Sequence, residues 1–317
     1  MTGPEKQHIL PRFYLSAFTQ NNLNQGFLNV IDFRRGKIFK VKPENIYQKG
    51  FYNDYSSAES KYNMERSLAD LEGILAPFYL NVINTGIVNG PKELGKLLSL
   101  VGLIQARGEW IRFFVSNLLP NQMINDILND MVTAEKWNYY VETEKSAGID
   151  VADWPTFENL KERIHSGSFI PKAPEFEKIK LITDLQRKFN DSLAGHEWSM
   201  AQASDASGGF ICSISPLVWS TPERGIAPWE YADLKSKELF ITFPLSSKYA
   251  LANHNEKKGA TYSITDDAVA YFNTRTLQHS GGVIYSGANQ FLIKSEDMLS
   301  TKRVTILKDK LFIEKII

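Results

Sequence analysis

The sequence predicts an α+β fold in which a helical N-terminal half with a small β-hairpin packs on a largely antiparallel sheet from the C-terminal half. Apolar residues recur at helical spacing through most of residues 1–195, whereas short β-prone runs dominate residues 196–317. Helices followed by strands are typical of α+β proteins, not of the alternation that builds a parallel sheet. We therefore expect one domain over residues 1–317, helical to about residue 195 and strand-rich from about residue 196.

The N-terminal elements follow from proline, glycine and apolar spacing. Pro11 sets the backbone angle of a first helical turn, which predicts a short helix over about residues 11–18. Two β-prone runs, 27–33 and 37–41, flank Arg35-Gly36, so we expect a hairpin there.

Longer helices are expected in the rest of the first half. An apolar stripe predicts an amphipathic helix over residues 59–85, and its members are Leu68, Leu71, Leu75, Phe78 and Val82. Pro91 opens a more apolar, central helix over about residues 92–118. Further helices are predicted over residues 122–146, about 155–165 and about 176–193.

The second half combines strands with one helix. The β-prone runs are residues 210–212, 239–243, 283–285 and 303–313. Between them, Thr265-Asp266-Asp267 is a capping sequence that predicts a helix through about Gln278, and Gly281-Gly282 ends it.

Composition limits the classes of partner. The chain has 36 basic and 36 acidic residues, so no net charge attracts it to nucleic acid or to an acidic membrane. The single cysteine, Cys212, excludes an internal disulfide and suits a reducing compartment. The N-terminus lacks an apolar signal region, and no apolar run approaches the roughly 18 residues of a membrane span. We therefore expect a cytoplasmic protein without a membrane partner.

Charge is nevertheless uneven along the chain. Residues 1–50 contain eight Lys/Arg and three Asp/Glu, whereas residues 122–162 contain three Lys/Arg and nine Asp/Glu. Such an uneven distribution of charge indicates either two solvated faces or a binding surface.

The apolar face of the central helix turns polar in its last turns. The apolar members of this face are Leu94, Leu98 and Val101, and the polar members are Gln105, Glu109 and Arg112. If this side is buried, its charges must be paired, because an unpaired buried charge is very costly. The face either lines a polar cleft or belongs to a helix that emerges into solvent.

Three further polar residues are candidates for chemistry. Glu65 and Glu72 are seven residues apart and face the same way, so they could bind a divalent metal or exchange protons, or simply form the rim of an amphipathic helix. His8 precedes a helix N-terminus, where it could bind an anion, ligate a metal or cap the helix. The other histidines lack zinc-site spacing, and the sequence contains no nucleophile elbow, phosphate loop or dinucleotide fingerprint.

Several blocks along the chain occur in a distinctive order. They are Gln7-His8-x-x-Pro11-Arg12-Phe13-x-Leu15-x-x-Phe18, Val30-Ile31-Asp32, Gly50-Phe51-Tyr52, Glu65-x-x-Leu68-x-x-x-Glu72, Gln105-Ala106-Arg107 with Arg112, Trp198, Phe210–Leu217, Phe243-Pro244-Leu245-Ser246, and Asn273 through Ile284-Tyr285-Ser286. Together, over about residues 8–290, they resemble the domain-of-unknown-function family DUF4238. The resemblance implies that the N-terminal motif, both long helices and the late sheet meet.

One block departs from the family pattern. The family reads Thr-Ser-Asp-Asn-Pro where this chain has Cys212-Ser213-Ile214-Ser215-Pro216, so Ile214 replaces an aspartate. Strand alternation places Ile214 on the same side as Cys212, which predicts a core position.

Two functional hypotheses follow. In the first, the chain is a nuclease-like or phosphate-ester hydrolase-like enzyme that acts on nucleic acid or nucleotides, with a divalent metal as a candidate cofactor. The predicted catalytic residues are His8, Glu65 and Glu72, and the predicted substrate-binding residues are Gln105, Arg107, Glu109, Arg112 and Asn273. In the second, the chain is a non-catalytic binding or interaction protein, such as a toxin or defence-system component with a protein partner, and the polar cluster is structural.

Overall fold

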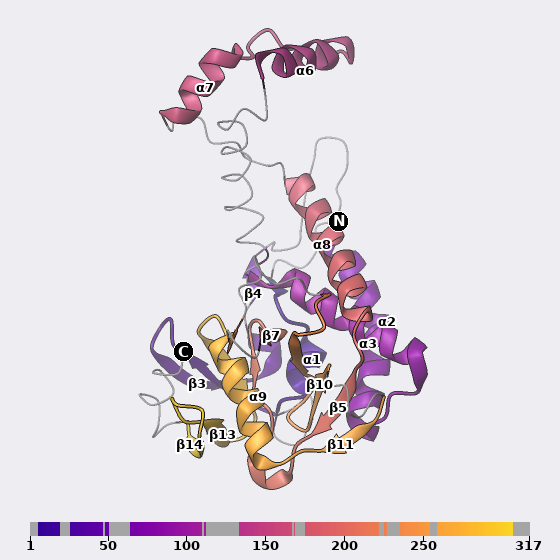
Figure 1. The fold of residues 1–317 in the computed structure, drawn as a ribbon, viewed down its shortest axis with the longest axis vertical. Coiled ribbons are helices and arrows are strands. Elements are labelled where there is room, and N and C mark those ends of the chain that lie inside the picture. The colour runs from indigo at the N-terminus through magenta and orange to yellow at the C-terminus, as the bar shows by residue number, and fades with distance from the viewer. Residues whose placement is uncertain are drawn as a thin grey trace. The chain divides into compact units, whose positions relative to one another are not determined.

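The computed structural model describes residues 6–19, 26–46, 48–50, 64–109, 111, 133–166, 168, 175–221, 225–226, 235–253 and 259–306 (Figure 1). It confirms the α+β class, with most helices in the N-terminal half and mainly antiparallel strands in the C-terminal half. The chain divides into a larger compact unit, residues 1–109 with 183–317, and a smaller one, residues 110–182.

The N-terminal hairpin forms as predicted. Strand β2 (Leu28–Asp32) pairs antiparallel with β3 (Lys37–Val41). Gly36 in the turn has a φ of 61°, which glycine adopts without the steric cost of a side chain. Before the hairpin lie β1 (Lys6–His8) and the short helix α1 (Arg12–Ser16), and after it come the short helix η2 (Pro43–Asn45) and β4 (Gln48–Gly50), which pairs with β1.

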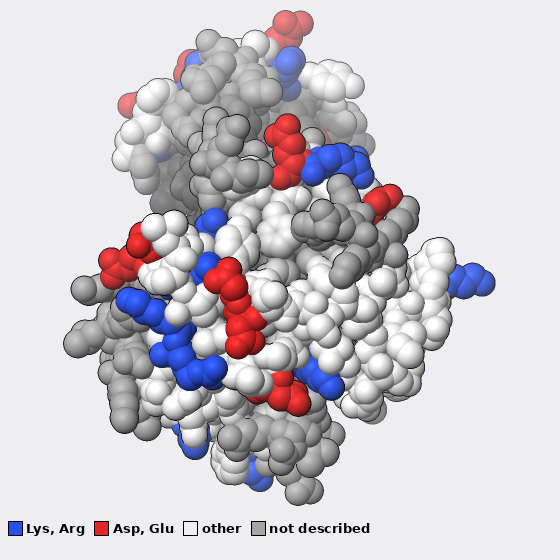
Figure 2. Space-filling model, turned by 60° about the horizontal axis from the view of Figure 1, so that its bottom comes forward, with Lys and Arg blue, Asp and Glu red and all other residues white. Residues whose placement is uncertain are grey.

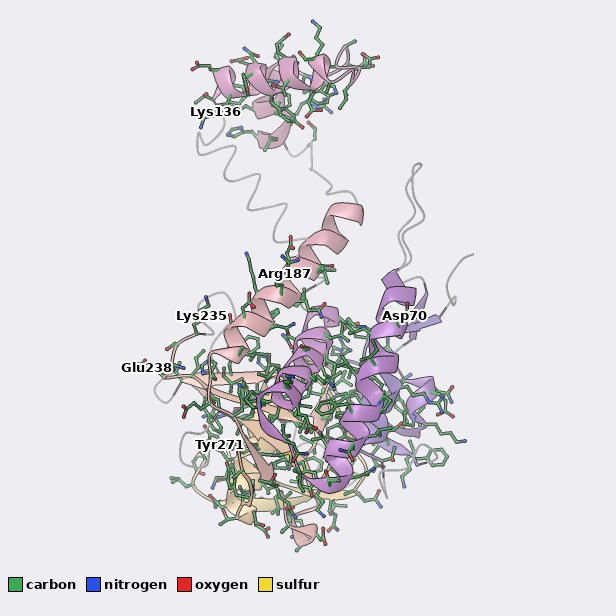
Figure 3. The ribbon with its side chains drawn as sticks, turned by 90° about the vertical axis from the view of Figure 1, so that its right-hand side faces the viewer. Asp70, Lys136, Arg187, Lys235, Glu238 and Tyr271 are labelled. Atoms are coloured by element: carbon green, nitrogen blue, oxygen red, sulfur yellow. The ribbon has the colours of Figure 1, made fainter. Side chains whose placement is uncertain are left out.

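Two long helices follow, α2 (Met64–Thr85) and α3 (Gly90–Arg107), and they lie side by side (Figure 3). From Leu97 to Arg107 almost every residue of α3 is buried. The later helix α8 (Glu175–Ala194) approaches α3 closely at Gly102, where an added Cβ would collide with the side chain of Asn190. Glycine at this position therefore permits the contact between the helices.

The prediction that the central helix continues to about residue 118 is wrong. Helix α3 ends at Arg107, because Gly108 has an extended backbone with a ψ of 148°. Glu109 lies beyond this break, so it does not continue the face formed by Leu94, Leu98 and Val101. Arg112 and residues 113–118 lie outside the described part of the chain.

The C-terminal half builds most of the sheet structure. A six-stranded sheet has the order β11-β5-β10-β9-β7-β8, in which only the β11–β5 pair is parallel. Its strands are β5 (Ser199–Gln202), β7 (Val218–Thr221), β8 (Gly225–Ile226), β9 (Phe240–Pro244), β10 (Tyr249–Ala252) and β11 (Thr261–Ser263).

A four-stranded sheet joins the two ends of the chain. Its order is β3-β2-β12-β6, so the N-terminal hairpin pairs with β12 (Val283–Ser286), which in turn pairs with β6 (Cys212–Ser213). Helix α9 (Asp266–Gln278) packs on β13 (Gln290–Lys294), which pairs with β14 (Thr301–Thr305) (Figure 1). Thr265 caps α9 as predicted, since its side chain accepts a hydrogen bond from the Ala268 amide.

Helices α1 and α2 meet the C-terminal sheet through two buried tyrosines. Tyr14 donates a hydrogen bond to the carbonyl oxygen of Pro244 at 2.8 Å, and Tyr79 donates one to that of Leu245. Both acceptors lie at the end of β9, so the N-terminal motif and the first long helix lie against the late sheet, in agreement with the family resemblance.

The smaller unit contains α6 (Ala134–Ser146) and α7 (Phe157–His165). Within the described part of the chain, no helix alone has the length and apolar character needed to span a membrane, although α2 from Asp70 and α3, bent by 113°, pass that test as a pair.

Candidate functional site

Two of the predicted site residues form an ion pair. Arg107, at the end of α3, donates a hydrogen bond from Nη1 to Oε1 of Glu72 on α2. The Arg107 side chain is 2% exposed and that of Glu72 is 25% exposed. Gln105, two residues earlier on α3, is also buried. The pair thus ties α2 to α3 from inside the larger unit.

Glu109 belongs to a second polar group, at the turn of the hairpin. Its Oε2 accepts a hydrogen bond from Arg34 Nη1 at 2.9 Å, and Arg34 Nε lies 3.9 Å from Oδ1 of the buried Asp32. Asp32 also accepts a hydrogen bond from the Arg35 amide at 3.1 Å. These contacts hold the hairpin against the end of α3. Sequence reasoning did not assign Asp32 or Arg34 to the cluster, and the family block around Asp32 was the available signal.

Asn273 lies in the interior of the fold, away from solvent. Its Oδ1 accepts a hydrogen bond from the Ile211 amide, and its Nδ2 donates to the carbonyl oxygens of Gly209 and Leu292, all at 3.0 Å. The side chain therefore links α9 to β13 and to the segment before β6. These three hydrogen bonds are all to backbone groups, so Asn273 stabilises the packing of α9 against the neighbouring segments.

The remaining predicted residues fall on parts that are not described. The side chains of His8 and Glu65, and Arg112 as a whole, lie outside the described residues. Among the residues that are described, no three His, Cys, Asp or Glu side chains lie close enough together to hold a metal ion.

Cys212 and Ile214 lie in the core, as predicted. Burial raises the pKa of the Cys212 thiol to about 12, and its Sγ donates a hydrogen bond to Tyr14 Oη at 3.4 Å. A thiol with that pKa is protonated at neutral pH and is not a nucleophile. Ile214 is 4% exposed, so the position of the family aspartate is occupied by core packing in this chain.

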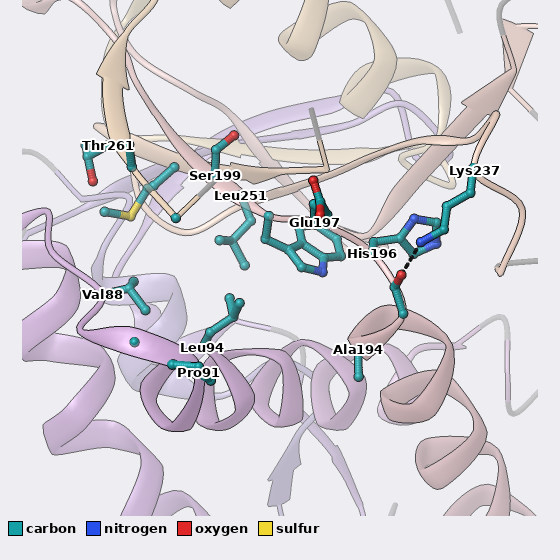
Figure 4. A pocket seen from close by; sticks show the side chains of 16 residues that line it. Val88, Pro91, Leu94, Ala194, His196, Glu197, Ser199, Lys237, Leu251 and Thr261 are labelled. Atoms are coloured by element: carbon teal, nitrogen blue, oxygen red, sulfur yellow. Dashed lines mark hydrogen bonds between the residues drawn. The ribbon is translucent and has the colours of Figure 1, made fainter. Parts of the chain in front are cut away.

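A pocket of about 550 Å³ opens elsewhere in the larger unit (Figure 4). The start of α3, the end of α8 and strands β5, β10 and β11 supply its walls. It is lined by Val88, Gly90, Pro91, Leu94, Ala194, Gly195, His196, Glu197, Trp198, Ser199, Met200, Lys237, Leu251, Gly259, Ala260 and Thr261. Most of these side chains are apolar.

The side chains of this pocket follow one another in a clear order along its length. His196 and Lys237 lie at one end, Val88 and Thr261 at the other, and Leu94 and Leu251 between them (Figure 4). The Lys237 ammonium donates a hydrogen bond to the carbonyl oxygen of Gly195, just beyond the end of α8. An ammonium group has three N–H donors, so it can bind a second acceptor at the same time.

The tautomer of His196 follows from its hydrogen bond with Asn253. Asn253 Oδ1 accepts a hydrogen bond from the Ile241 amide and its Nδ2 donates to the carbonyl oxygen of Leu239, both at 2.6 Å, which fixes the orientation of the amide. The same Nδ2 lies 3.2 Å from His196 Nδ1, which must therefore accept. In the neutral ring the proton is then on Nε2.

Sequence reasoning missed this pocket. His196 and Lys237 are isolated in the sequence, and only Trp198 belongs to a block that resembles the family. The Trp198 indole donates its N–H to the carbonyl oxygen of Leu193 at 2.8 Å. With that polar group satisfied, the ring contributes an apolar surface to the pocket.

Charged residues of both signs lie next to one another on the face shown in Figure 2. Among the described residues on that face, no basic patch stands apart from acidic neighbours. This pattern matches the balance of 36 basic and 36 acidic residues.

Comparison with known proteins supports the order of blocks seen in the sequence. The chain matches the family described as "Protein of unknown function (DUF4238)" over residues 6–296. No curated protein and no solved structure matches the chain significantly. The match covers nearly the whole sequence, including both long helices and the C-terminal sheets, and the chain therefore belongs to the DUF4238 family.

Proposed function

We propose that this chain is a cytoplasmic binding protein that takes a small molecule with an apolar body and a single negative charge into the pocket between α3, α8 and the six-stranded sheet. The observation that carries the proposal is the pocket itself, which is lined mostly by apolar side chains and has the Lys237 ammonium at one end. Its volume of about 550 Å³ is within the range of roughly 300–1,000 Å³ found for small-molecule sites. In this proposal the ion pairs at the end of α3 are structural.

The apolar part suits a hydrocarbon or aromatic body. Met200 and Leu251 line the pocket from the sheet and Trp198 from the residue before β5, and each is almost fully buried. Leu94 of α3 lines it from the opposite side (Figure 4). A ligand body between these side chains would remove apolar surface from water, which stabilises the complex by about 25 cal/mol per Å² of ligand and pocket surface.

The polar end suits a carboxylate. Lys237 provides a positive charge, and the imidazole of His196 belongs to the same lining. The carboxylate of Glu197 also lines the pocket, so the local charge is not strongly positive. That balance favours a monoanion over a phosphate dianion, because a second negative charge would be repelled by Glu197.

Isothermal titration calorimetry with decanoate, decanol and decylamine tests this proposal. We expect decanoate to bind most tightly of the three. Lys237→Met should lower the affinity for decanoate by about tenfold or more, since a hydrogen bond to a charged group contributes roughly 1.5–3 kcal/mol. Decanol binding should not change in the variant. Lys235→Met is the matched control, because Lys235 is an exposed lysine that does not line the pocket. Equal affinity for the acid and the alcohol, or an equal effect of both lysine variants, would exclude the proposal.

A second candidate function is phosphate-ester hydrolysis near the end of α3. The observation that favours it is the concentration of charge there: the buried guanidinium of Arg107 is two residues from Glu109, which pairs with Arg34 beside Asp32. The purified protein would then degrade RNA, DNA or nucleotides in the presence of Mg²⁺. His8→Ala and Arg112→Ala should abolish that activity, and the same rate in both variants and the wild type would rule out the assignment.

A further inference from the structure

The smaller unit contains three aromatic side chains in mutual contact, of which Tyr140 and Trp154 are stacked and the other two pairs are tilted. Trp137 and Tyr140, one turn apart on α6, lie with ring centroids 6.1 Å apart, and Trp154 lies 6.1 Å from Trp137 and 5.8 Å from Tyr140. The Trp137 indole donates a hydrogen bond to the carbonyl oxygen of Pro155 at 3.1 Å, which anchors the segment before α7 to α6. We call these three residues the aromatic triad.

The aromatic triad is not a sealed core. No residue of α6 is buried, and the Tyr140 side chain is 48% exposed although it belongs to the stacked group. Trp137 and Trp154 are also partly exposed. Large aromatic side chains that remain accessible in this way are typical of interaction surfaces, where rigid rings provide contact area at low entropic cost.

The charge around the triad identifies the kind of partner. Residues 133–156 contain five acidic and two basic side chains, namely Glu135, Glu142, Glu144, Asp150 and Asp153 against Lys136 and Lys145. Lys145 lies 3.9 Å from Glu142, so part of its charge is already balanced. Stacking rings alone would also suit single-stranded nucleic acid, but the excess of carboxylates repels phosphates.

We propose that the aromatic triad with its acidic surround binds an arginine-bearing segment of a partner protein. A guanidinium stacks on an aromatic face and pairs in the same geometry with a carboxylate, whereas a lysine ammonium is a more strongly hydrated point charge. Glu144 lies one helical turn after Tyr140, so one arginine can reach both the Tyr140 ring and this carboxylate. The surface belongs to the smaller unit and is independent of the pocket.

Fluorescence anisotropy with the full chain and labelled twelve-residue peptides tests the proposal. The peptides alternate serine with arginine, lysine or glutamate, and a twelve-nucleotide single strand of DNA is a further probe. We expect the arginine peptide to bind several-fold more tightly than the lysine peptide, and binding of the other two probes to be undetectable. Tyr140→Ala should lower the affinity for the arginine peptide about tenfold, because it removes a cation–π contact that contributes roughly 1–2 kcal/mol. Tyr140→Phe keeps an aromatic ring at this position and should therefore bind the peptide like the wild type.

The chain provides matched controls for both parts of the surface. Tyr139 is on the same helix, is 76% exposed and is not part of the triad, so Tyr139→Ala should leave binding unchanged. Glu144→Lys should weaken binding, whereas Glu238→Lys, an exposed position in the larger unit, should not. The proposal is overturned if Tyr139→Ala and Tyr140→Ala have equal effects, if arginine and lysine peptides bind equally, if the two charge reversals are equivalent, or if the DNA binds more tightly than the arginine peptide.

Discussion

Arg107 is the residue whose burial most constrains the interpretation of the candidate site. A guanidinium at 2% exposure is tolerated only with a counter-charge and hydrogen bonds, and Glu72 provides a carboxylate for it. This need explains why a charged side chain lies at the end of an otherwise apolar helix. The sequence left open whether the face of α3 that contains Gln105 lines a cleft or emerges into solvent, and the structure places Gln105 in the interior.

We predict that Glu72→Gln lowers the free energy of unfolding by about 3 kcal/mol, because it removes the carboxylate paired with a buried guanidinium. Urea denaturation measures the loss. Glu44→Gln is the control, since Glu44 and Arg12 form a more exposed and longer pair, at 3.9 Å with side-chain exposures of 33% and 55%. That change should cost less than about 1 kcal/mol. A Glu72→Gln protein as stable as the wild type would contradict the structural role and favour a functional one.

Ile214 occupies the position where the family has an aspartate, and its burial leads to a second prediction. Ile214→Asp should destabilise the fold by more than about 3 kcal/mol, because a carboxylate would be placed in the core without a designated partner. Ile214→Val, which removes one methyl group, should cost only about 1 kcal/mol. Thermal denaturation distinguishes the two. A stable Ile214→Asp variant that binds Mn²⁺ in a calorimetric titration would instead support descent from a metal enzyme.

At the scale of single elements, the C-terminal end of α9 combines helix capping with burial. His279 is the C-cap of α9, and its ring lies edge-on to the buried Trp219 with centroids 4.8 Å apart. A histidine at a helix C-terminus is usually more easily protonated, because the helix dipole favours a positive charge there. Here burial dominates and lowers the pKa of His279 from 6.5 to about 4.

The depressed pKa predicts a loss of stability in mild acid. Between pH 6.5 and about 4 the unfolded chain protonates His279 whereas the folded chain does not, so the unfolded state binds more protons. The contribution of His279 to the free energy of unfolding is complete above pH 6.5. It falls by about 1.4 kcal/mol per pH unit as the pH is lowered toward 4. Urea denaturation at pH 7 and pH 5 should show a smaller drop for His279→Gln than for the wild type. His165→Gln, an exposed position on α7, should behave like the wild type, and identical pH profiles for all three proteins would contradict the assignment.

Helix α3 shows where reasoning on a single element fails. The apolar period continues through Gly108, so a pattern of sequence spacing places Glu109 on the same face as Leu98. A glycine in an extended conformation ends the helix instead, and Glu109 then pairs with Arg34 of the hairpin. Glycine permits both conformations, so the tertiary contacts decide between them.

At the scale of the whole molecule, the division into two compact units predicts stepwise unfolding. The described tryptophans are divided between the units, with Trp137 and Trp154 in the smaller one and Trp198 and Trp219 in the larger one. Trp198 and Trp219 are almost fully buried, whereas helix α6 buries no residue. The smaller unit should therefore unfold at a lower urea concentration, because its folded state buries less apolar surface.

Tryptophan fluorescence in urea measures this difference. The wild type should show two transitions, and a variant with Trp137→Phe and Trp154→Phe should lose most of the amplitude of the first. A variant with Trp198→Phe and Trp219→Phe should retain the first transition and lose amplitude in the second. One coincident transition in all three proteins would show that the two units unfold together.

The sequence by itself determined the α+β class, the hairpin around Gly36, the amphipathic helices and the Thr265 cap of α9. Each of these depends on residues within a few positions of one another, through backbone angles, capping or helical period, so a local pattern is sufficient. The order of blocks also sufficed to identify the family, since it needs no three-dimensional information.

Tertiary structure alone decided the sheet order and the composition of the sites. Strand β2 pairs with β12 more than 200 residues later, and the short strand β5 pairs with β10 about 50 residues later. The pairing of Arg107 with Glu72 and of Glu109 with Arg34, and the meeting of His196 and Lys237 in one pocket, likewise join separate elements. Which distant groups meet depends on packing and loop closure over the whole chain, and these contributions are not recorded in any local stretch of sequence.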